Sequence, residues 1–108
     1  MTQQDIEEFI GNLGQHARDA LSEPGLVLFK NPDSGIYAIV HDGSRPLRVE
    51  AKCDVTLAKL LREKYETVLP SKNMEATTWN EIICSGQLTD DEVKDLLVLS
   101  YNLVANRQ

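Results

Sequence analysis

Basic side chains gather in one window of the sequence and are the residues best suited to contact phosphate groups. Residues 44–72 carry seven of the eleven bases and only four acids, a net charge of +3. Arg48 and Lys52 lie on one face of a predicted strand, about 14 Å apart at ~3.4 Å per residue. That span matches contact with two phosphates of a nucleic-acid backbone. The candidate nucleic-acid-binding residues are Arg45, Arg48, Lys52, Lys72, Trp79 and Asn80, with Lys30 as a further base.

These candidates also have a structural interpretation that the sequence leaves open. Glu50 lies between Arg48 and Lys52 on the same face, so this strand could instead present a solvated face of mixed charge. Trp79 could stack on a base, and Asn80 could bond a base edge. Because two isoleucines follow closely, the alternative is that Trp79 packs against the sheet while Asn80 bonds nearby backbone.

The remaining reactive side chains do not form a pattern typical of an enzyme or a metal centre. No spacing of His, Cys, Asp and Glu around His16 or His41 matches a recurrent ligand set. Cys53 and Cys84 lie in strand-like runs without a histidine nearby, so we expect small buried hydrophobes rather than nucleophiles or a disulfide. We therefore expect no enzyme, no cofactor and no metal. Acids of the first predicted helix form only a sparse ridge, expected to be a solvated face: Asp5, Glu7, Glu8 and Asp19.

The elements that position these residues begin with an amphipathic helix. Thr2 and Asp5 signal its start, and Pro24-Gly25 is expected to end it. Apolar residues recur through it at helical spacing: Ile6, Phe9, Ile10, Leu13, Ala17 and Leu21. Strands are predicted at 26–30, 36–41 and 47–53, separated by two clusters of turn formers, which indicates a three-stranded meander. In the third strand, alternation places Arg48, Glu50 and Lys52 on an outer, charged face.

The second half of the chain predicts two helices with two strands between them. Asp54 is a helix N-cap, and the helical pattern continues to Tyr65, before Pro70. A short strand at 66–69 and a longer one at 77–84 follow, and a capping box, Thr89 with Glu92, starts the last helix. The predicted order is α-β-β-β-α-β-β-α. The predicted fold class is therefore α+β, a two-layer antiparallel sheet backed by helices.

Length and composition limit the kinds of protein this chain can be. Its 108 residues, 42% hydrophobic and 26% charged, predict one folded domain rather than a disordered segment. No apolar run is long enough to cross a bilayer, and the amino end does not resemble a targeting segment, so we expect no membrane and a cytoplasmic protein. The net charge of −6 opposes attraction to nucleic acid and favours a basic partner.

Several segments resemble, in order and spacing, the MmcQ/YjbR family. They are Ala51-Lys-Cys-Asp54, Leu60-Leu-Arg-Glu-Lys-Tyr65, Thr78-Trp-Asn80, Ser85-Gly-Gln-Leu88 and Ser100-Tyr-Asn-Leu-Val104. The resemblance covers about residues 26–104 and implies a single domain over residues 1–108. It also implies the CyaY-like fold of the bacterial frataxin homologue. The family is described as DNA-binding-like, which implies DNA as a partner.

Two functional hypotheses follow from the residues and the resemblance. The first is a non-enzymatic DNA-binding protein that presents an outer sheet face and hairpin loops to the phosphate backbone. The alternative is an acidic protein–protein interaction module with a basic partner and no nucleic-acid binding. The oligomeric state is expected to be a monomer by default.

Overall fold

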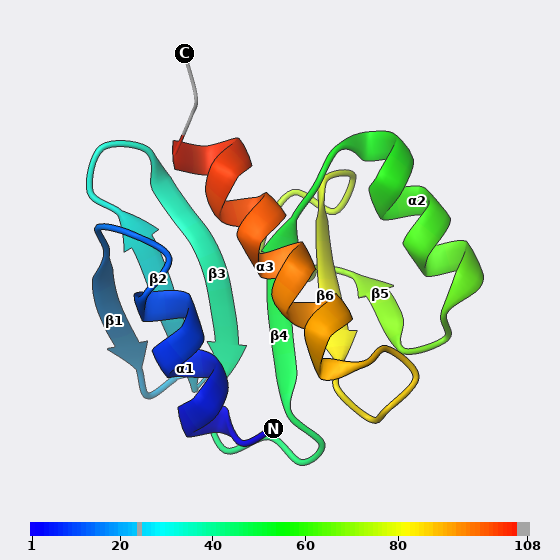
Figure 1. Cartoon of the computed structure of the whole chain (residues 1–108), viewed down its shortest axis with the longest axis horizontal. Coiled ribbons are helices and arrows are strands. Elements are labelled where there is room, and N and C mark those ends of the chain that lie inside the picture. The colour runs from blue at the N-terminus through cyan, green and yellow to red at the C-terminus, as the bar shows by residue number, and fades with distance from the viewer. Residues whose placement is uncertain (24, 106–108) are drawn as a thin grey trace.

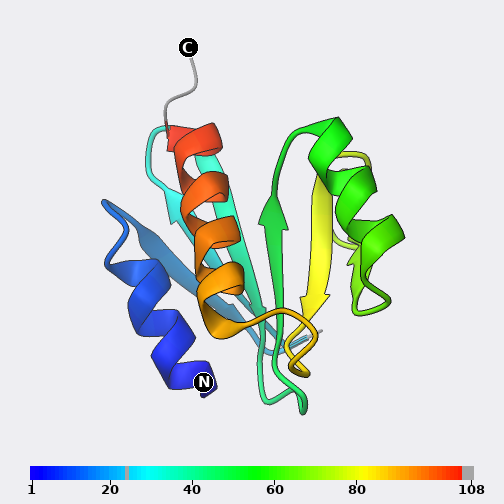
Figure 2. The same ribbon diagram turned by 45° about the vertical axis from the view of Figure 1, so that its right-hand side comes forward.

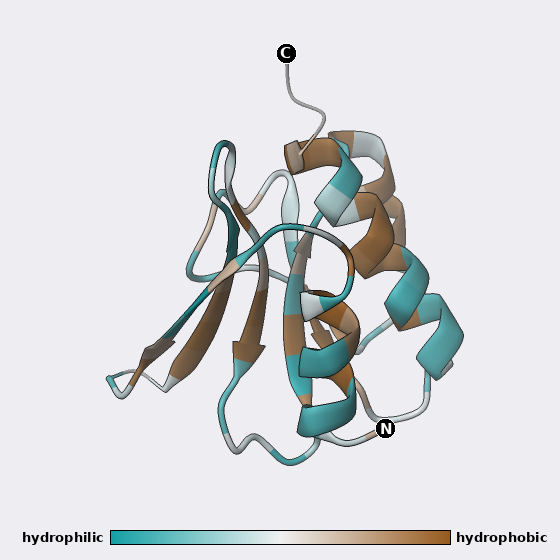
Figure 3. Cartoon of the chain, turned by 60° about the vertical axis from the view of Figure 1, so that its left-hand side comes forward, coloured by the Kyte–Doolittle hydropathy of each residue, from teal (hydrophilic) through white to brown (hydrophobic). Residues whose placement is uncertain are grey.

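The structure is a computed structural model that describes residues 1–23 and 25–105. In these residues, six antiparallel strands form one sheet in the order β1-β2-β3-β4-β6-β5, and three helices cover one of its faces (Figures 1 and 3). The elements are α1 Gln3–Gly11, β1 Ala17–Leu21, β2 Leu26–Asn31, β3 Gly35–His41, β4 Arg48–Lys52, α2 Val55–Lys64, β5 Val68–Pro70, β6 Trp79–Ile83 and α3 Asp90–Ala105.

The α+β class and the two layers predicted from the sequence are confirmed. Helix α3 packs across β3 and β4, and α1 lies beside α3 (Figure 2). Helix α2 covers β5 and β6, on the same face but at the other end of the strand order. The hydrophobic core lies between the sheet and the helices and includes Ile10, Phe29, Val49 and Leu97. Across residues 1–23 and 25–105, no helix has the length and apolar character needed to cross a membrane. The CyaY-like comparison stays an expectation of the resemblance.

The prediction of one long first helix is wrong. Helix α1 begins as expected, because Thr2 and Asp5 form a capping box, and the hydrogen bonds from Thr2 lower the pKa of Asp5. It ends at Gly11, however, and residues 17–21 form strand β1 instead. All five β1 residues are exposed, so the helical spacing of Ala17 and Leu21 did not mark a buried face. Pro24, expected to end that helix, lies outside the described residues. The observed order is therefore α-β-β-β-β-α-β-β-α.

Gly14 lies where the turn between α1 and β1 passes against α3. A Cβ atom at this position would lie 2.0 Å from the phenolic oxygen of Tyr101. Tyr101 in turn meets Tyr37 edge-on, with ring centroids 4.8 Å apart. A side chain at position 14 would therefore displace an aromatic pair that connects α3 to β3.

Strands β3 and β4 diverge beneath α3 (Figure 1). A serine hydroxyl of α3 connects the two strands where they separate. The last residues paired between them at this end are Ala38 and Ala51. Beyond this pair, the Ser100 hydroxyl accepts a hydrogen bond from the Lys52 amide at 2.8 Å and donates to the Tyr37 carbonyl at 2.6 Å. Ser100 is fully buried, so it satisfies two backbone groups that the diverging strands cannot pair with each other.

Candidate functional site

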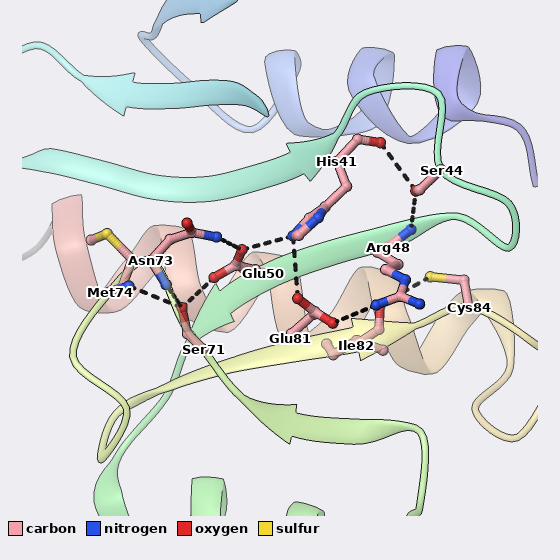
Figure 4. A network of polar contacts seen from close by, with 10 residues as sticks. All are labelled: His41, Ser44, Arg48, Glu50, Ser71, Asn73, Met74, Glu81, Ile82 and Cys84. Carbon is pink, nitrogen blue, oxygen red and sulfur yellow. Dashed lines mark hydrogen bonds and ion pairs between the residues drawn. The ribbon is translucent and has the colours of Figure 1, made fainter. Parts of the chain in front are cut away.

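The sheet face opposite the helices carries the charged residues of β4, but it is not the solvated face expected from the sequence. Alternation places Arg48, Glu50 and Lys52 on this face, as predicted. Glu50 is nevertheless 0% exposed, so the expectation of a solvent-facing glutamate is wrong. The reason is non-local, because the segment that follows β5 folds over this part of the sheet and supplies hydrogen bonds to the carboxylate (Figure 4).

Glu50 is the centre of a polar network built from three parts of the chain. The Ser71 hydroxyl bonds its Oε1 atom, while Asn73 Nδ2 donates to Oε2 at 2.6 Å. The His41 Nε2 atom lies 2.8 Å from the same Oε2 atom (Figure 4). The Ser71 oxygen also accepts hydrogen bonds from the backbone amides of Asn73 and Met74, which fixes the turn over the sheet.

Glu81 extends this network onto the neighbouring strand. It pairs directly with Glu50 across β4 and β6, so the two carboxylates share one face. His41 Nε2 lies 3.4 Å from Glu81 Oε1, and Arg48 Nη1 lies 3.1 Å from Glu81 Oε2. No buried side-chain nitrogen or oxygen of the described residues lacks a hydrogen-bond partner. Arg48 therefore forms an ion pair with a buried glutamate, which makes its guanidinium less available to bind a phosphate.

Trp79 and Asn80, the two candidates for base contacts, lie in the interior. Trp79 is 3% exposed and Asn80 is 2% exposed. Asn80 Nδ2 donates to the Ala58 carbonyl at 3.1 Å, and its Oδ1 atom accepts from Arg62 at 2.8 Å. Asn80 therefore connects β6 to α2, and the Trp79 side chain is buried rather than presented to a ligand. This is the arrangement of the packing interpretation.

The other three candidate residues are on or near the surface. Arg45 is exposed in the turn between β3 and β4, Lys72 is exposed in the segment after β5, and Lys52 is half-buried at the end of β4. None of the three forms an ion pair within residues 1–23 and 25–105. Lys30, in contrast, pairs with Asp19, with 2.7 Å between Nζ and Oδ2. The six candidates therefore do not converge on one surface.

The two cysteines are free thiols of low reactivity. Cys53 is buried and Cys84 is half-buried. Burial raises the pKa of Cys53, and it raises the pKa of Cys84 to about 11. Because the thiolate is the nucleophilic form, both side chains are poorly suited to covalent catalysis at neutral pH.

The edge strand β1 is the second feature that the sequence did not indicate. Within residues 1–23 and 25–105 it pairs only with β2, so among these residues its outer edge carries backbone amides and carbonyls without strand partners. Beside it lies a groove of about 700 Å³ between α1 and the β1–β2 pair, with Phe29 among its lining residues. The opposite edge, β5, is only three residues long and ends at Pro70. The two edges of the sheet are therefore unequal, and β1 is the open one.

Neither feature has a local signal in the sequence. His41, Glu50 and Glu81 come together only through the pairing of β3 with β4 and of β4 with β6. Alternation assigns a residue such as Glu50 or Glu81 to one face of its own strand, but it does not show which strands are neighbours in the sheet. Strand β1 was missed because its two alanines and one leucine are few and exposed.

Fold and site together define an α+β protein whose sheet has one open edge and, on the face away from the helices, a buried polar cluster. No model of a protein family matches the chain. It is similar to protein YjbR of Escherichia coli K12, with 28% identity over 71 residues, which is 66% of this chain. The YjbR of Escherichia coli O157:H7 matches equally well, and the match spans about 60% of the length of each relative. Both are described as uncharacterised.

Solved structures show the same fold. A Deinococcus radiodurans protein, DR2400, with the family domain DUF419, matches with a TM-score of 0.87 and 20% identity, over 98% of this chain and 80% of that one. A Pseudomonas syringae protein matches with a TM-score of 0.80 and 21% identity, over 96% and 99% of the two chains. The sequence match to YjbR thus supports the resemblance to the MmcQ/YjbR family, and the two solved structures show the same fold.

Proposed function

We propose that this protein is a non-enzymatic binding module that takes up an extended, basic segment of a partner protein along strand β1. The observation that carries the proposal is the open edge of β1 beside the α1 groove. An extended segment can add to such an edge as a further strand, with alternate side chains entering the neighbouring groove. The backbone hydrogen bonds then give affinity, and the groove gives specificity.

The side chains of β1 leave its edge unobstructed. Proteins often protect an exposed edge with an unpaired lysine, a proline or a bulge. Here Arg18 turns toward α1 and pairs with Glu7, with 2.8 Å between Nε and Oε1. Asp19 pairs with Lys30 across the strands. Both charges of β1 are thus compensated within the chain, so a partner strand does not meet a free charge from β1.

The charge around the groove favours a basic partner. Glu7 and Glu8 line it from α1. The charge of Glu7 is compensated by Arg18. Glu8 Oε1 instead accepts a hydrogen bond from the neutral amide nitrogen Nε2 of Gln4, at 3.4 Å. The first 43 residues carry seven acids and two bases, and the whole chain carries a net charge of −6. Lysine or arginine at alternate positions of the partner would therefore find complementary charge.

The experiment is fluorescence anisotropy of a labelled, blocked peptide of alternating lysine and threonine. We expect saturable binding, weakened by Glu8→Lys and unchanged by Glu63→Lys. Glu63→Lys is the matched control, because Glu63 is an exposed acid of α2, which lies by β5 and β6 at the opposite edge of the sheet from β1. A peptide N-methylated at every backbone position should not bind, because neither of its edges keeps an N–H group to pair with a strand. Equal weakening by both variants, or no binding up to about 1 mM, which corresponds to about −4 kcal/mol, contradicts the proposal.

Nucleic-acid binding is the second candidate function. What supports it is the exposure of Arg45 and Lys72, together with half-exposed Lys52, all without ion pairs in the described part of the chain. Anisotropy of a labelled 20-base-pair DNA tests it at about 50 and 200 mM salt, a range over which phosphate contacts lose affinity steeply. Micromolar binding that collapses at high salt and disappears in Arg45→Glu/Lys72→Glu would support DNA as the ligand. No change in anisotropy at low salt would exclude this candidate.

A further inference from the structure

We propose that His41, Glu50 and Glu81 form a binding site for one divalent transition-metal cation, of which Zn²⁺ is the probe. The three residues come from three adjacent strands, β3, β4 and β6. They lie on the sheet face away from the helices, and the proposal is independent of peptide binding at β1.

The three side chains lie close enough together to share one metal ion. His41 Nε2 lies 2.8 Å from Glu50 Oε2 and 3.4 Å from Glu81 Oε1, and the three possible ligand atoms lie within 4.8 Å of one another. Ligands bound to Zn²⁺ at about 2.0 Å in a tetrahedron are about 3.3 Å apart. A cation could therefore enter between these atoms after small side-chain adjustments.

The outer oxygen of each carboxylate is already held in place. Ser71 bonds Glu50 Oε1, and Arg48 bonds Glu81 Oε2 at 3.1 Å. The other oxygen of each glutamate then faces His41 Nε2 (Figure 4). Asn73 also donates to Glu50 Oε2, which has a further lone pair for a cation. Hydrogen bonds of this kind orient metal ligands and strengthen metal binding.

The charge of the cluster also favours a cation. Glu50 is 0% exposed, and its partners are a hydroxyl, an amide and an imidazole. Among the residues that the structure describes, Arg48 is the one permanent cation that contacts either carboxylate, and it contacts only Glu81. Two buried carboxylates thus face one fixed positive charge, and burying an uncompensated carboxylate is costly. A divalent ion compensates the deficit.

The donor set indicates which class of cation would bind. One imidazole nitrogen and two carboxylate oxygens suit Zn²⁺ and neighbouring first-row divalent ions. Ca²⁺ and Mg²⁺ prefer about six or more oxygen ligands, which this cluster does not supply. The His41 side chain is 21% exposed, which gives an ion a path to the cluster.

The experiment is a titration of untagged protein with Zn²⁺, followed by the imidazole ¹⁵N resonances and by calorimetry. The chain has two histidines, so His16 is an internal reference. We expect one Zn²⁺ per chain, a large shift of the His41 Nε2 resonance and none at His16. His41→Gln should weaken binding more than about 100-fold, since loss of an outer hydrogen-bond partner alone costs 10–100-fold. His16→Gln should bind as the wild type does, and Ca²⁺ and Mg²⁺ should leave both resonances unchanged.

Several results would overturn the proposal. An unchanged His41 resonance in the wild-type protein at saturating Zn²⁺ would do so without any variant that must fold. Equal Zn²⁺ affinity of His41→Gln and the wild type would do the same. Titration with Co²⁺ provides a further test, because a thiolate-to-metal charge-transfer band would place the ion on a cysteine instead. Glu81→Gln, checked for folding by its amide spectrum, should weaken Zn²⁺ binding if the carboxylate is a ligand.

Discussion

Replacing Arg48 should destabilise the protein, whereas replacing Arg45, only three positions away, should not. Arg48 Nη1 lies 3.1 Å from a carboxylate oxygen of Glu81, whose side chain is 9% exposed. A hydrogen bond to a charged group contributes about 1.5–3 kcal/mol, and the Arg48 side chain is 41% exposed, which reduces this contribution through solvent screening. We therefore expect Arg48→Ala to lower the free energy of unfolding by about 1–2 kcal/mol. Arg45 is exposed in a turn, so Arg45→Ala should change it by less than about 0.5 kcal/mol.

The charge reversal Arg48→Glu should have a larger effect. It places a third carboxylate beside Glu50 and Glu81, and like charges about 4 Å apart repel by about 4 kcal/mol at an effective dielectric constant of about 20. Because the new side chain can turn toward water, we expect a total loss of about 3–5 kcal/mol. A loss of DNA binding in Arg48→Glu would therefore report unfolding as readily as a lost phosphate contact.

Urea denaturation followed by circular dichroism measures both effects. With a slope of about 1–2 kcal/mol per M, Arg48→Ala should lower the midpoint by about 1 M. The midpoint of Arg45→Ala should stay within about 0.4 M of the wild type, the equivalent of about 0.5 kcal/mol. Equal midpoints for the two variants would refute the assignment of Arg48 to a buried acid. They would also restore Arg48 as a free base on the sheet surface.

Three further predictions concern packing and thiol chemistry. Ser100→Ala should lower the free energy of unfolding by about 2–4 kcal/mol, because a buried amide and a buried carbonyl each lose a hydrogen-bond partner worth about 1–3 kcal/mol. In the same urea titration, the control Ser85→Ala should leave it unchanged, because Ser85 is exposed. Gly14→Ala should cost about 1–3 kcal/mol by overpacking against Tyr101, and a raised melting temperature would contradict this. Because burial raises the pKa of Cys84 to about 11, its alkylation by iodoacetamide should stay slow in the folded protein until about pH 10, but should be fast at about pH 8.5 in urea. Folded and unfolded chains that alkylate at the same rate at pH 8.5 would refute the burial of this thiol. The pKa of Cys84 is about 11 in the folded protein and 9.0 for a free thiol. The stability that comes from burying the neutral thiol is therefore full below about pH 9 and is lost as the pH rises to about 11.

Local signals in the sequence predicted the helix starts and most of the sheet. The capping box predicted at Thr89 and Glu92 is confirmed, and so is the helix start signalled by Thr2 and Asp5, because a cap depends on residues three positions apart. At the second box, the hydrogen bonds from Thr89 lower the pKa of Glu92. The strands of the meander and the last helix are confirmed for the same reason, since alternation and helical spacing are local patterns. Strand β1 was not predicted, because exposed residues leave no pattern of burial to detect.

The burial of Glu50 could not be predicted, because it depends on residues far along the chain. Alternation assigned its face correctly, but Ser71 and Asn73 cover that face from 21 and 23 positions away. The same holds for Ser100, which bonds Tyr37 across 63 positions. Contacts of this range follow from strand order and loop paths, which the sequence pattern does not encode.

The segments that carry the family resemblance contain residues that hold the fold together. Trp79, Asn80 and Ser100 are all buried, and the last two bond neighbouring elements. A resemblance based on such residues reports the fold, and function depends on sites added to a fold. The sites that this structure points to, the β1 edge and the His41 cluster, lie outside the resembling segments.

Amide hydrogen exchange of β1, measured by NMR with and without the lysine–threonine peptide, tests the proposed binding mode most directly. Alternate amides of residues 17–21 point away from β2 and should exchange rapidly in the free protein. If the peptide adds as a strand, these same amides should become protected in the complex, while exchange at β5 stays unchanged. Binding without protection of β1, or protection at another element, would contradict the account.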